Sequence, residues 1–222
     1  MEKISRNQPW PEIVFGSSDS KKSQAIRRAI HSGELKKLSA KLYTSNLKDK
    51  PEQIIKRNLY HILGELFPGA VLSHRTALEA GPSKDNVVFL TYKYTKNISL
   101  PGLTVRLLQG QEAMPGDTPF IANLFLASRE RALLENLQTS RQRETHAKTL
   151  PRTEIESYLD RLCNSYGVEE LNRVRDKAKT LSKKLHFEKE FKILDKIIGA
   201  LLGTKESTLL QTSQGKARAS IS

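Results

Sequence analysis

The segment from Ser20 to Thr44, SKKSQAIRRAIHSGELKKLSAKLYT, constrains the fold of this chain more than any other stretch. It opens with the pattern of a short amphipathic helix, and a lysine-rich pair of short segments follows Ser32 and Gly33. At 100° per residue, the apolar helix positions fall within an arc of about 140°. These positions are Ala25, Ile26, Ala29 and Ile30. Ser18, Asp19 or Ser20 can cap the start, and Gly33 suits the left-handed position after the end.

The opposite arc of this predicted helix is basic and polar and contains no acid. Its members are Ser20, Lys21, Gln24, Arg27, Arg28 and His31. Arginine side chains bond guanine edges, glutamine can read adenine, and lysines hold phosphates. The face therefore suits a helix that lies in the major groove of DNA. The alternative is an ordinary solvated helix whose charges only face water.

The segment that follows, Glu34 to Thr44, predicts a hairpin of two short strands that meet near Ser39 and Ala40. Its apolar residues would point inward, and Lys36, Lys37 and Lys41 would point outward. A basic hairpin placed beside a groove-binding helix can contact backbone phosphate. An ordinary surface hairpin, with lysines that discourage edge pairing, is the alternative. Helix, glycine and basic hairpin in this order favour double-stranded DNA as the partner.

The net charge of +13 is unevenly distributed along the 222 residues. Residues 1–50 carry a net +6, residues 51–138 a net +1, and residues 139–222 a net +6. Two basic regions that flank a nearly neutral centre fit polyanion binding, although charge alone does not separate DNA from RNA or an acidic protein. There is no run of eighteen apolar residues and no signal sequence, which predicts a cytoplasmic chain with no membrane partner. A single cysteine, Cys163, excludes an internal disulfide and a cysteine-based zinc site.

The remaining patterns predict an α+β fold with four parts. We expect a winged-helix-like segment at residues 1–50, a mixed α/β core with a small sheet at 51–138, a three-helix bundle at 150–203 and a mobile tail at 204–222. Within the core, one helix begins at Pro51, a strand covers 70–72, and a helix covers 74–79. Further strands lie between Asn86 and residue 108, with turns at 96–97 and 101–102. A polar linker is expected at 139–149, and Gly203 should end the last helix.

No motif for catalysis, a metal or a cofactor stands out. The chain has no Gly-rich phosphate loop, no Gly-x-Ser-x-Gly and no His-Glu-x-x-His. His74 is the most suggestive histidine, but a capping or packing role is favoured because no nucleophile and acid accompany it in the sequence. Arg129 and Arg131 are expected either to pair with Glu130 and Glu135 or to line a surface, and Cys163 lies on an apolar helix stripe. We therefore predict a protein that is not an enzyme.

Several segments together carry a resemblance to a known family. SGELKKLSAKLYTSNL is similar to the winged-helix segment of AbiEi-type antitoxins, whose helix ends in a glycine, a leucine and a basic wing that closes on Tyr-Thr. VLSHRTALEAG, VFLTYKY, ISLPGLTVRLL and LASRERALLENL then follow in the family's order. The same block resembles the N-terminal part of longer Fic-family proteins, where KTLPRTEIESYLDRL and the helices up to IIGALLGT continue the similarity. The resemblance covers roughly residues 20–220.

The resemblance implies a DNA-binding antitoxin that represses its own operon and neutralises a cognate toxin. Two departures from the family pattern qualify this. Only nineteen residues precede the basic helix, which gives a reduced winged helix and backbone-dominated DNA binding. The Fic signature, His-Pro-Phe followed by Gly-Asn-Gly-Arg, does not occur, so adenylylation is not assigned. The alternative function is a regulatory, protein-binding module of a Fic-type protein that stops before its enzyme domain.

Overall fold

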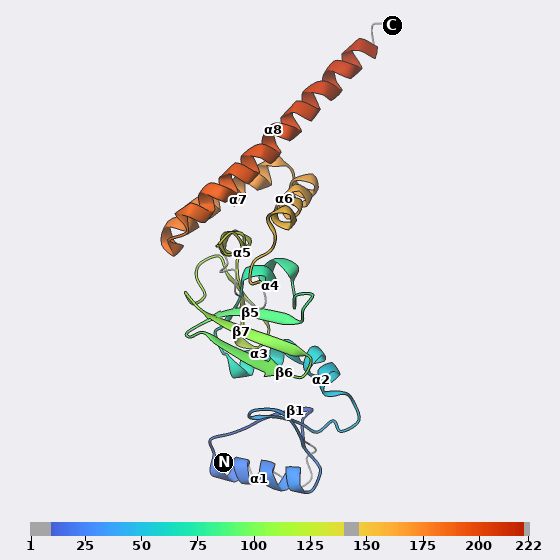
Figure 1. Ribbon diagram of the computed structural model, residues 1–222, viewed down its shortest axis with the longest axis vertical. Coiled ribbons are helices and arrows are strands. Elements are labelled where there is room, and N and C mark those ends of the chain that lie inside the picture. Colours follow the sequence, from blue (N-terminus) through green and yellow to red (C-terminus); the bar gives the residue numbers. More distant parts are fainter. Residues whose placement is uncertain (1–9, 140–146, 220–222) are drawn as a thin grey trace. The chain divides into compact units, whose positions relative to one another are not determined.

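The computed structural model describes residues 10–139 and 147–219 of a mixed α/β chain. The chain divides into two compact units. Figure 1 shows its helices and strands coloured along the sequence. Unit 1 contains the described residues up to Val71, with Pro82–Ala113 and Pro119–Phe125. Unit 2 contains Leu72–Gly81, Met114–Thr118 and the chain from Leu126 onward. Each unit is described by itself below.

Unit 1 begins with a small antiparallel sheet that carries one helix. Its elements are β1 (Ile13–Phe15), α1 (Ser20–His31), β2 (Lys36–Ser39) and β3 (Leu42–Thr44). The strand order is β1-β3-β2, so the hairpin β2–β3 is extended by the strand that precedes the helix. The predicted helix and hairpin are both confirmed, with Asp19 as the residue that caps α1.

The two faces of this small sheet pack against different partners. Val14 on β1 lies opposite Tyr43 on β3, and both belong to the cluster that Ile26 and Ala29 of α1 complete. The neighbouring residue Phe15 is on the other face, where its ring meets that of His61 edge-on at 5.7 Å. Because successive strand residues alternate between faces, α1 covers one side of the sheet and the helix that carries His61 lies on the other.

The helix predicted from Pro51 is in fact two helices, α2 (Pro51–Arg57) and α3 (Leu59–Leu66). The prediction of one continuous helix is wrong because Asn58 leaves helical geometry, with φ of −104° and ψ of 10°. Its side-chain amide donates to the carbonyl oxygen of Ile54 at 3.0 Å and to Glu12 Oε2 at 2.8 Å. Asparagine side chains that bond the backbone in this way compete with helix continuation.

The larger sheet of unit 1 has the strand order β6-β7-β5-β4-β9-β8. Its strands are β4 (Val71–Leu72), β5 (Val87–Tyr92), β6 (Lys96–Leu100), β7 (Leu103–Gln109), β8 (Thr118–Pro119) and β9 (Phe125–Leu126). The last residues of β4 and β9 and the first of β8 are assigned to unit 2. β5 pairs with β7 in parallel, and β6 pairs with β7 antiparallel. The expected strands in this region are confirmed, but the predicted turn at 96–97 is wrong, because both residues belong to β6.

A short 3-10 turn, η1 (Ile121–Asn123), packs on α3 in the same unit. The contact is so close that a Cβ added to Gly64 would stand 1.8 Å from the carbonyl oxygen of Ala122. Ala122 itself has a left-handed backbone, with φ of 53°. Gly64 is therefore required by the close approach of two backbones and not by a turn.

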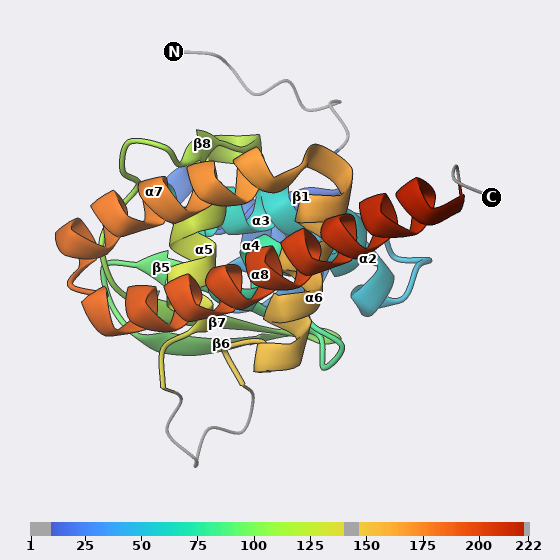
Figure 2. The same cartoon turned by 90° about the horizontal axis from the view of Figure 1, so that it is seen from above.

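Unit 2 is built from helices, drawn from two directions in Figures 1 and 2. They are α4 (His74–Glu79), α5 (Arg129–Asn136), α6 (Arg152–Tyr166), α7 (Val168–Leu185) and α8 (Glu188–Ala219). One apolar core joins Leu133 and Leu134 of α5 to buried residues of α6, α7 and α8, so α5 adds a helix to the three that the sequence predicts for this core. Cys163 lies in this core, as expected.

The breaks between the long helices are local. Gly167, with φ of 84°, separates α6 from α7, and His186, with φ of 57°, ends α7 in the left-handed conformation. The prediction that Gly203 ends the last helix is wrong, because α8 continues to Ala219 and an added Cβ at Gly203 meets open space. Residues 140–146 of the predicted linker and the last residues of the predicted tail, 220–222, lie outside the described residues.

Candidate nucleic-acid interface

The helix α1 is fixed at both ends by hydrogen bonds within unit 1. The side chain of Asp19 accepts from the backbone N–H of Lys22 at 2.8 Å. At the other end, the backbone N–H groups of Glu34 and Leu35 both donate to the carbonyl oxygen of Ala29, at 2.8 and 3.0 Å. Gly33 lies between Ala29 and these two donors and adopts φ of 76°, the left-handed conformation common just after the end of a helix. This turn sets the direction of the hairpin relative to the helix.

The predicted DNA-contact residues of α1 share its exposed face. Ser20, Lys21, Gln24, Arg27, Arg28 and His31 are all exposed. Arg27, Arg28 and His31 also line an open hollow at the end of α1, together with Ser32. Among the residues that the structure describes, no ion pair involves Lys21, Arg27 or Arg28. Their charges are therefore not neutralised by a neighbouring carboxylate.

One apolar residue of α1 is not where the pattern predicts it. Ile26 and Ala29 are buried, but Ile30 is 37% exposed. The cluster that packs α1 on the small sheet includes Ile26 and Ala29 but not Ile30, so only part of the apolar arc is buried. The prediction that Ile30 packs inward is therefore wrong, and its side chain borders the cationic face.

The hairpin places its three lysines differently from one another. Lys37 lies opposite Tyr43, on the face of the sheet that α1 covers. Lys36 lies opposite Thr44 and therefore belongs to the other face. Lys41 sits at the tip with φ of 56°, and its carbonyl oxygen accepts from the N–H of Gly16 at 2.8 Å. All three lysines are exposed, but only Lys37 and Lys41 can share a surface with α1.

A polar cluster around Glu12 anchors β1 to the rest of unit 1. Arg57 of α2 donates to both carboxylate oxygens of Glu12, while Asn58 and Asn46 donate to it at 2.8 and 3.0 Å. Arg57 also pairs with Asp49 at 2.7 Å. The hydrogen bonds from Arg57, then those from Asn58 and Asn46, lower the pKa of Glu12 to about 2. No sequence pattern marks this cluster, since its members are 34 to 46 residues apart from Glu12.

Unit 2 contains a second polar cluster, and it is buried. Arg131 of α5 bonds Asp117 at 2.6 Å and Glu135 at 2.9 Å, with side-chain exposures of 1%, 0% and 5%. Glu135 also accepts from the backbone N–H of His74 at 2.9 Å. The sequence left Arg131 either to pair with an acid such as Glu135 or to line a surface; the structure shows the ion pair and adds Asp117 to it. Arg129 pairs instead with Glu170 of α7 at 2.6 Å.

His74 is buried and held in a left-handed conformation, with φ of 52°. Burial lowers the pKa of His74, and the nearby positive charges of Lys148 and Arg131 act in the same direction against the opposing effect of Glu135. Ser73 Oγ lies 3.1 Å and Glu135 Oε2 lies 3.8 Å from the same ring atom, Nδ1. A catalytic triad needs nucleophile and carboxylate at different ring nitrogens, so this arrangement is a packing cluster.

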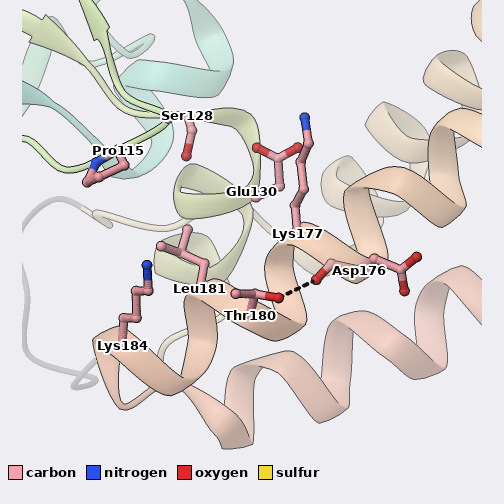
Figure 3. A pocket seen from close by; sticks show the side chains of 9 residues that line it. Pro115, Ser128, Glu130, Asp176, Lys177, Thr180, Leu181 and Lys184 are labelled. Carbon is pink, nitrogen blue, oxygen red and sulfur yellow. Dashed lines mark hydrogen bonds between the residues drawn. The ribbon is translucent and has the colours of Figure 1, made fainter.

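Unit 2 also has a pocket of about 480 Å³ between the start of α5, residues 115–116 and α7. Figure 3 shows its lining, in which the Thr180 hydroxyl donates to the carbonyl oxygen of Asp176 at 3.2 Å. Ser128, the one hydroxyl from the α5 side, already accepts from the N–H of Arg131 as the cap of that helix. The pocket brings together charges of both signs, with no nucleophile–base pair among its lining residues.

Comparison with protein-family models, with curated proteins and with solved structures finds no match to this chain. Within the described residues, no group of three or more His, Cys, Asp or Glu side chains is placed to hold a metal ion. No helix in that part of the chain has both the length and the apolar character needed to span a bilayer. The surface formed by α1 with Lys37 and Lys41 is thus the strongest candidate site. It is chosen for its exposed cations and not for similarity to a known protein.

Proposed function

We propose that this chain is a DNA-binding transcriptional regulator of antitoxin type. In this proposal the segment β1–α1–β2–β3 is a reduced winged helix, the central sheet is its α/β core, and α6 to α8 form its C-terminal bundle. α1 lies in the major groove, and Lys37 and Lys41 contact phosphate beside it. By the resemblance to AbiEi-type antitoxins, the protein represses its own operon and neutralises a cognate toxin.

The observation that carries the proposal is the exposed face of α1. Its charged side chains, Lys21, Arg27 and Arg28, have no ion-pair partner among the described residues. The bonds from Glu34 and Leu35 to Ala29 hold the hairpin in a fixed direction beside this face. A rigid helix with unpaired arginines next to a basic hairpin supplies base contacts and phosphate contacts from one surface.

The test is DNA binding by the full chain, measured as fluorescence anisotropy of a duplex from directly upstream of its reading frame. The double variant Arg27→Ala with Arg28→Ala should bind DNA more weakly. The slope of log K against log salt concentration should become less negative by about 1.8, which is about 0.9 for each lost phosphate contact. Arg152→Ala with Arg161→Ala is the control, because these arginines of α6 are exposed and the change in net charge is equal. Equal effects of the two double variants would remove the groove assignment.

A second measurement separates the regulator from the protein-binding alternative. The product of the neighbouring reading frame is co-expressed and tested for stable association with this chain. DNA binding no stronger than that of a generic basic protein, together with a stable complex, would replace the proposal by the regulatory module of a Fic-type or toxin system.

A further inference from the structure

The turn between α7 and α8 carries a concentration of positive charge that the interface on α1 does not use. From Lys177 to Lys196 the chain has seven lysines against three acids, Glu188, Glu190 and Asp195. Asp195 is already paired with Arg175 of α7. Two of these three acids lie in the first turn of α8, where they complement the helix dipole. The lysines are therefore in excess on the exposed surface of this helical hairpin.

The ion pair between Arg175 and Asp195 identifies one side of the two helices. Lys179 and Lys183 follow Arg175 at intervals of four residues, so all three form one row along α7. Lys192 precedes Asp195 by three residues and lies beside it on α8. α7 and α8 pack against each other, and Figure 2 draws them side by side and running in opposite directions. Lys179, Lys183 and Lys192 consequently lie on the same side of the hairpin.

The outer face of α8 extends this row. Leu194, Ile197 and Ile198 define the buried face of the helix. At 100° per residue, Lys189, Lys192 and Lys196 lie opposite that face. Both lysine groups are exposed, and no ion pair in the described part of the chain includes any of them. The acid within this surface is Asp195, and its charge is already paired with Arg175.

We propose that these five lysines, termed the α7–α8 strip, bind the phosphate backbone of duplex DNA as a second contact surface. The strip consists of Lys179, Lys183, Lys189, Lys192 and Lys196. It has no arginine fork and no glutamine or asparagine among its members, so it supplies charge without base readout. The choice of DNA as the polyanion rests on the proposed function; the existence of the cationic surface does not.

The spacing of the strip fits a polyphosphate chain. At 1.5 Å per residue, Lys179 and Lys183 are about 6 Å apart along α7, and Lys189 and Lys196 are about 10 Å apart along α8. A duplex presents one negative charge per roughly 1.7 Å of its axis, so a strip of this length faces several phosphates at once. Flexible lysine stems allow each ammonium to reach the nearest one. We expect about three contacts from the five lysines.

The experiment compares the full-length chain with two triple variants of equal net charge. Lys179→Gln, Lys183→Gln and Lys192→Gln remove the centre of the strip without adding acids. Lys48→Gln, Lys84→Gln and Lys93→Gln are the control, because these lysines are exposed in unit 1 outside both surfaces. Circular dichroism and urea unfolding check that each variant is folded. Binding to the upstream duplex is measured from 50 to 200 mM salt.

Near 0.1 M salt the strip variant should bind the duplex at least roughly tenfold more weakly than the unmodified chain. Its slope of log K against log salt concentration should be less negative by about 2 to 3. The control variant should bind like the unmodified chain. Equal weakening in both triple variants would reduce the effect to net charge and overturn the proposal. Unchanged DNA binding by the strip variant, with lost binding to polyglutamate, would assign the strip to an acidic protein and also overturn it.

The two proposals fail separately. If the Arg27 and Arg28 variant loses binding and the strip variant does not, the strip inference alone is wrong. If the strip variant loses binding and the Arg27 and Arg28 variant does not, the groove assignment of α1 is wrong and the strip stands. If the unmodified chain binds no DNA above the level of a generic basic protein, both are wrong.

Discussion

Arg131→Met should destabilise unit 2 more than any other single change of an ionic side chain in that unit. The guanidinium of Arg131 lies between Asp117 and Glu135, at 2.6 and 2.9 Å, and all three side chains are almost inaccessible to water. Methionine keeps much of the volume of the arginine stem but removes the cation. The carboxylates of Asp117 and Glu135 would then remain buried without a counter-charge.

Breaking a buried ion pair by removing one partner costs about 3–5 kcal/mol. The lower end applies here, because both carboxylates keep backbone donors: Asp117 accepts from the N–H groups of Met114 and Ser128, and Glu135 accepts from that of His74. A loss of about 3 kcal/mol is a large part of the 5–15 kcal/mol that stabilises a typical protein. At about 2–4 °C for each kcal/mol, the melting temperature should fall by roughly 6–12 °C.

Arg129→Met is the matched control on the same helix. Its single ion pair with Glu170 is 34% and 20% exposed, so its loss should cost at most about 1 kcal/mol. Urea unfolding followed by both tryptophan fluorescence and circular dichroism gives the two free energies and detects separate unfolding of the units. Adding Asp117→Asn and Glu135→Gln to Arg131→Met should recover part of the loss, because the uncompensated charges are removed together. Free energies for the two single variants that agree within about 0.5 kcal/mol would refute the reasoning.

Three further changes test other parts of the structure. Gly64→Ala should cost at least about 3 kcal/mol in urea unfolding, because its Cβ would stand 1.8 Å from a backbone oxygen; Gly199→Ala, which meets open space in α8, should instead be neutral or stabilising by up to about 1 kcal/mol. Burial lowers the folded-state pKa of His74, so the unfolded chain binds its proton more readily and stability should fall as pH drops below 6.5. His74→Asn, which tolerates the left-handed backbone, should flatten that pH dependence, and an unchanged slope would contradict the assignment. Glu12 has a pKa of about 2 when folded against 4.5 ordinarily, so its contribution is present above pH 4.5 and is lost as pH falls toward 2. After allowance for its exposure, Glu12→Gln should lower stability by about 1 kcal/mol at pH 7 and by much less near pH 2 in thermal melts.

The features that sequence could predict are those decided by near neighbours. Asp19 and Gly33 bound α1 through bonds that reach no more than six residues, and the alternation of Leu38 and Leu42 with lysines sets the hairpin. The break between α2 and α3 has a different origin. Asn58 leaves helical geometry while bonded to Glu12, which is 46 residues away, so no pattern within the helix could reveal it.

The buried cluster of unit 2 shows the same limit. Spacing along α5 indicates that Arg131 and Glu135 can pair, because residues four apart share a helix face. It cannot indicate that Asp117, in a loop before the helix, closes the other side of the guanidinium at 2.6 Å. Nor can it separate Arg131, which is buried, from Arg129, which reaches Glu170 on α7. Burial decides between a surface pair and a structural one, and burial is a property of the whole fold.

The proposed interface depends on how α1 is held in unit 1. Its support is a sheet: β1 adds to β3, the Glu12 cluster ties β1 to α2, and the N–H of Gly16 donates to the hairpin tip. This support leaves five cations on one surface, from Lys21, Arg27 and Arg28 with Lys37 and Lys41. With about −0.9 for each contact, these five cations give a slope of log K against log salt concentration no steeper than about −4.5. Three further contacts from the α7–α8 strip would make this slope about −7. The measured salt dependence of the unmodified chain therefore distinguishes one surface from two before any variant is made.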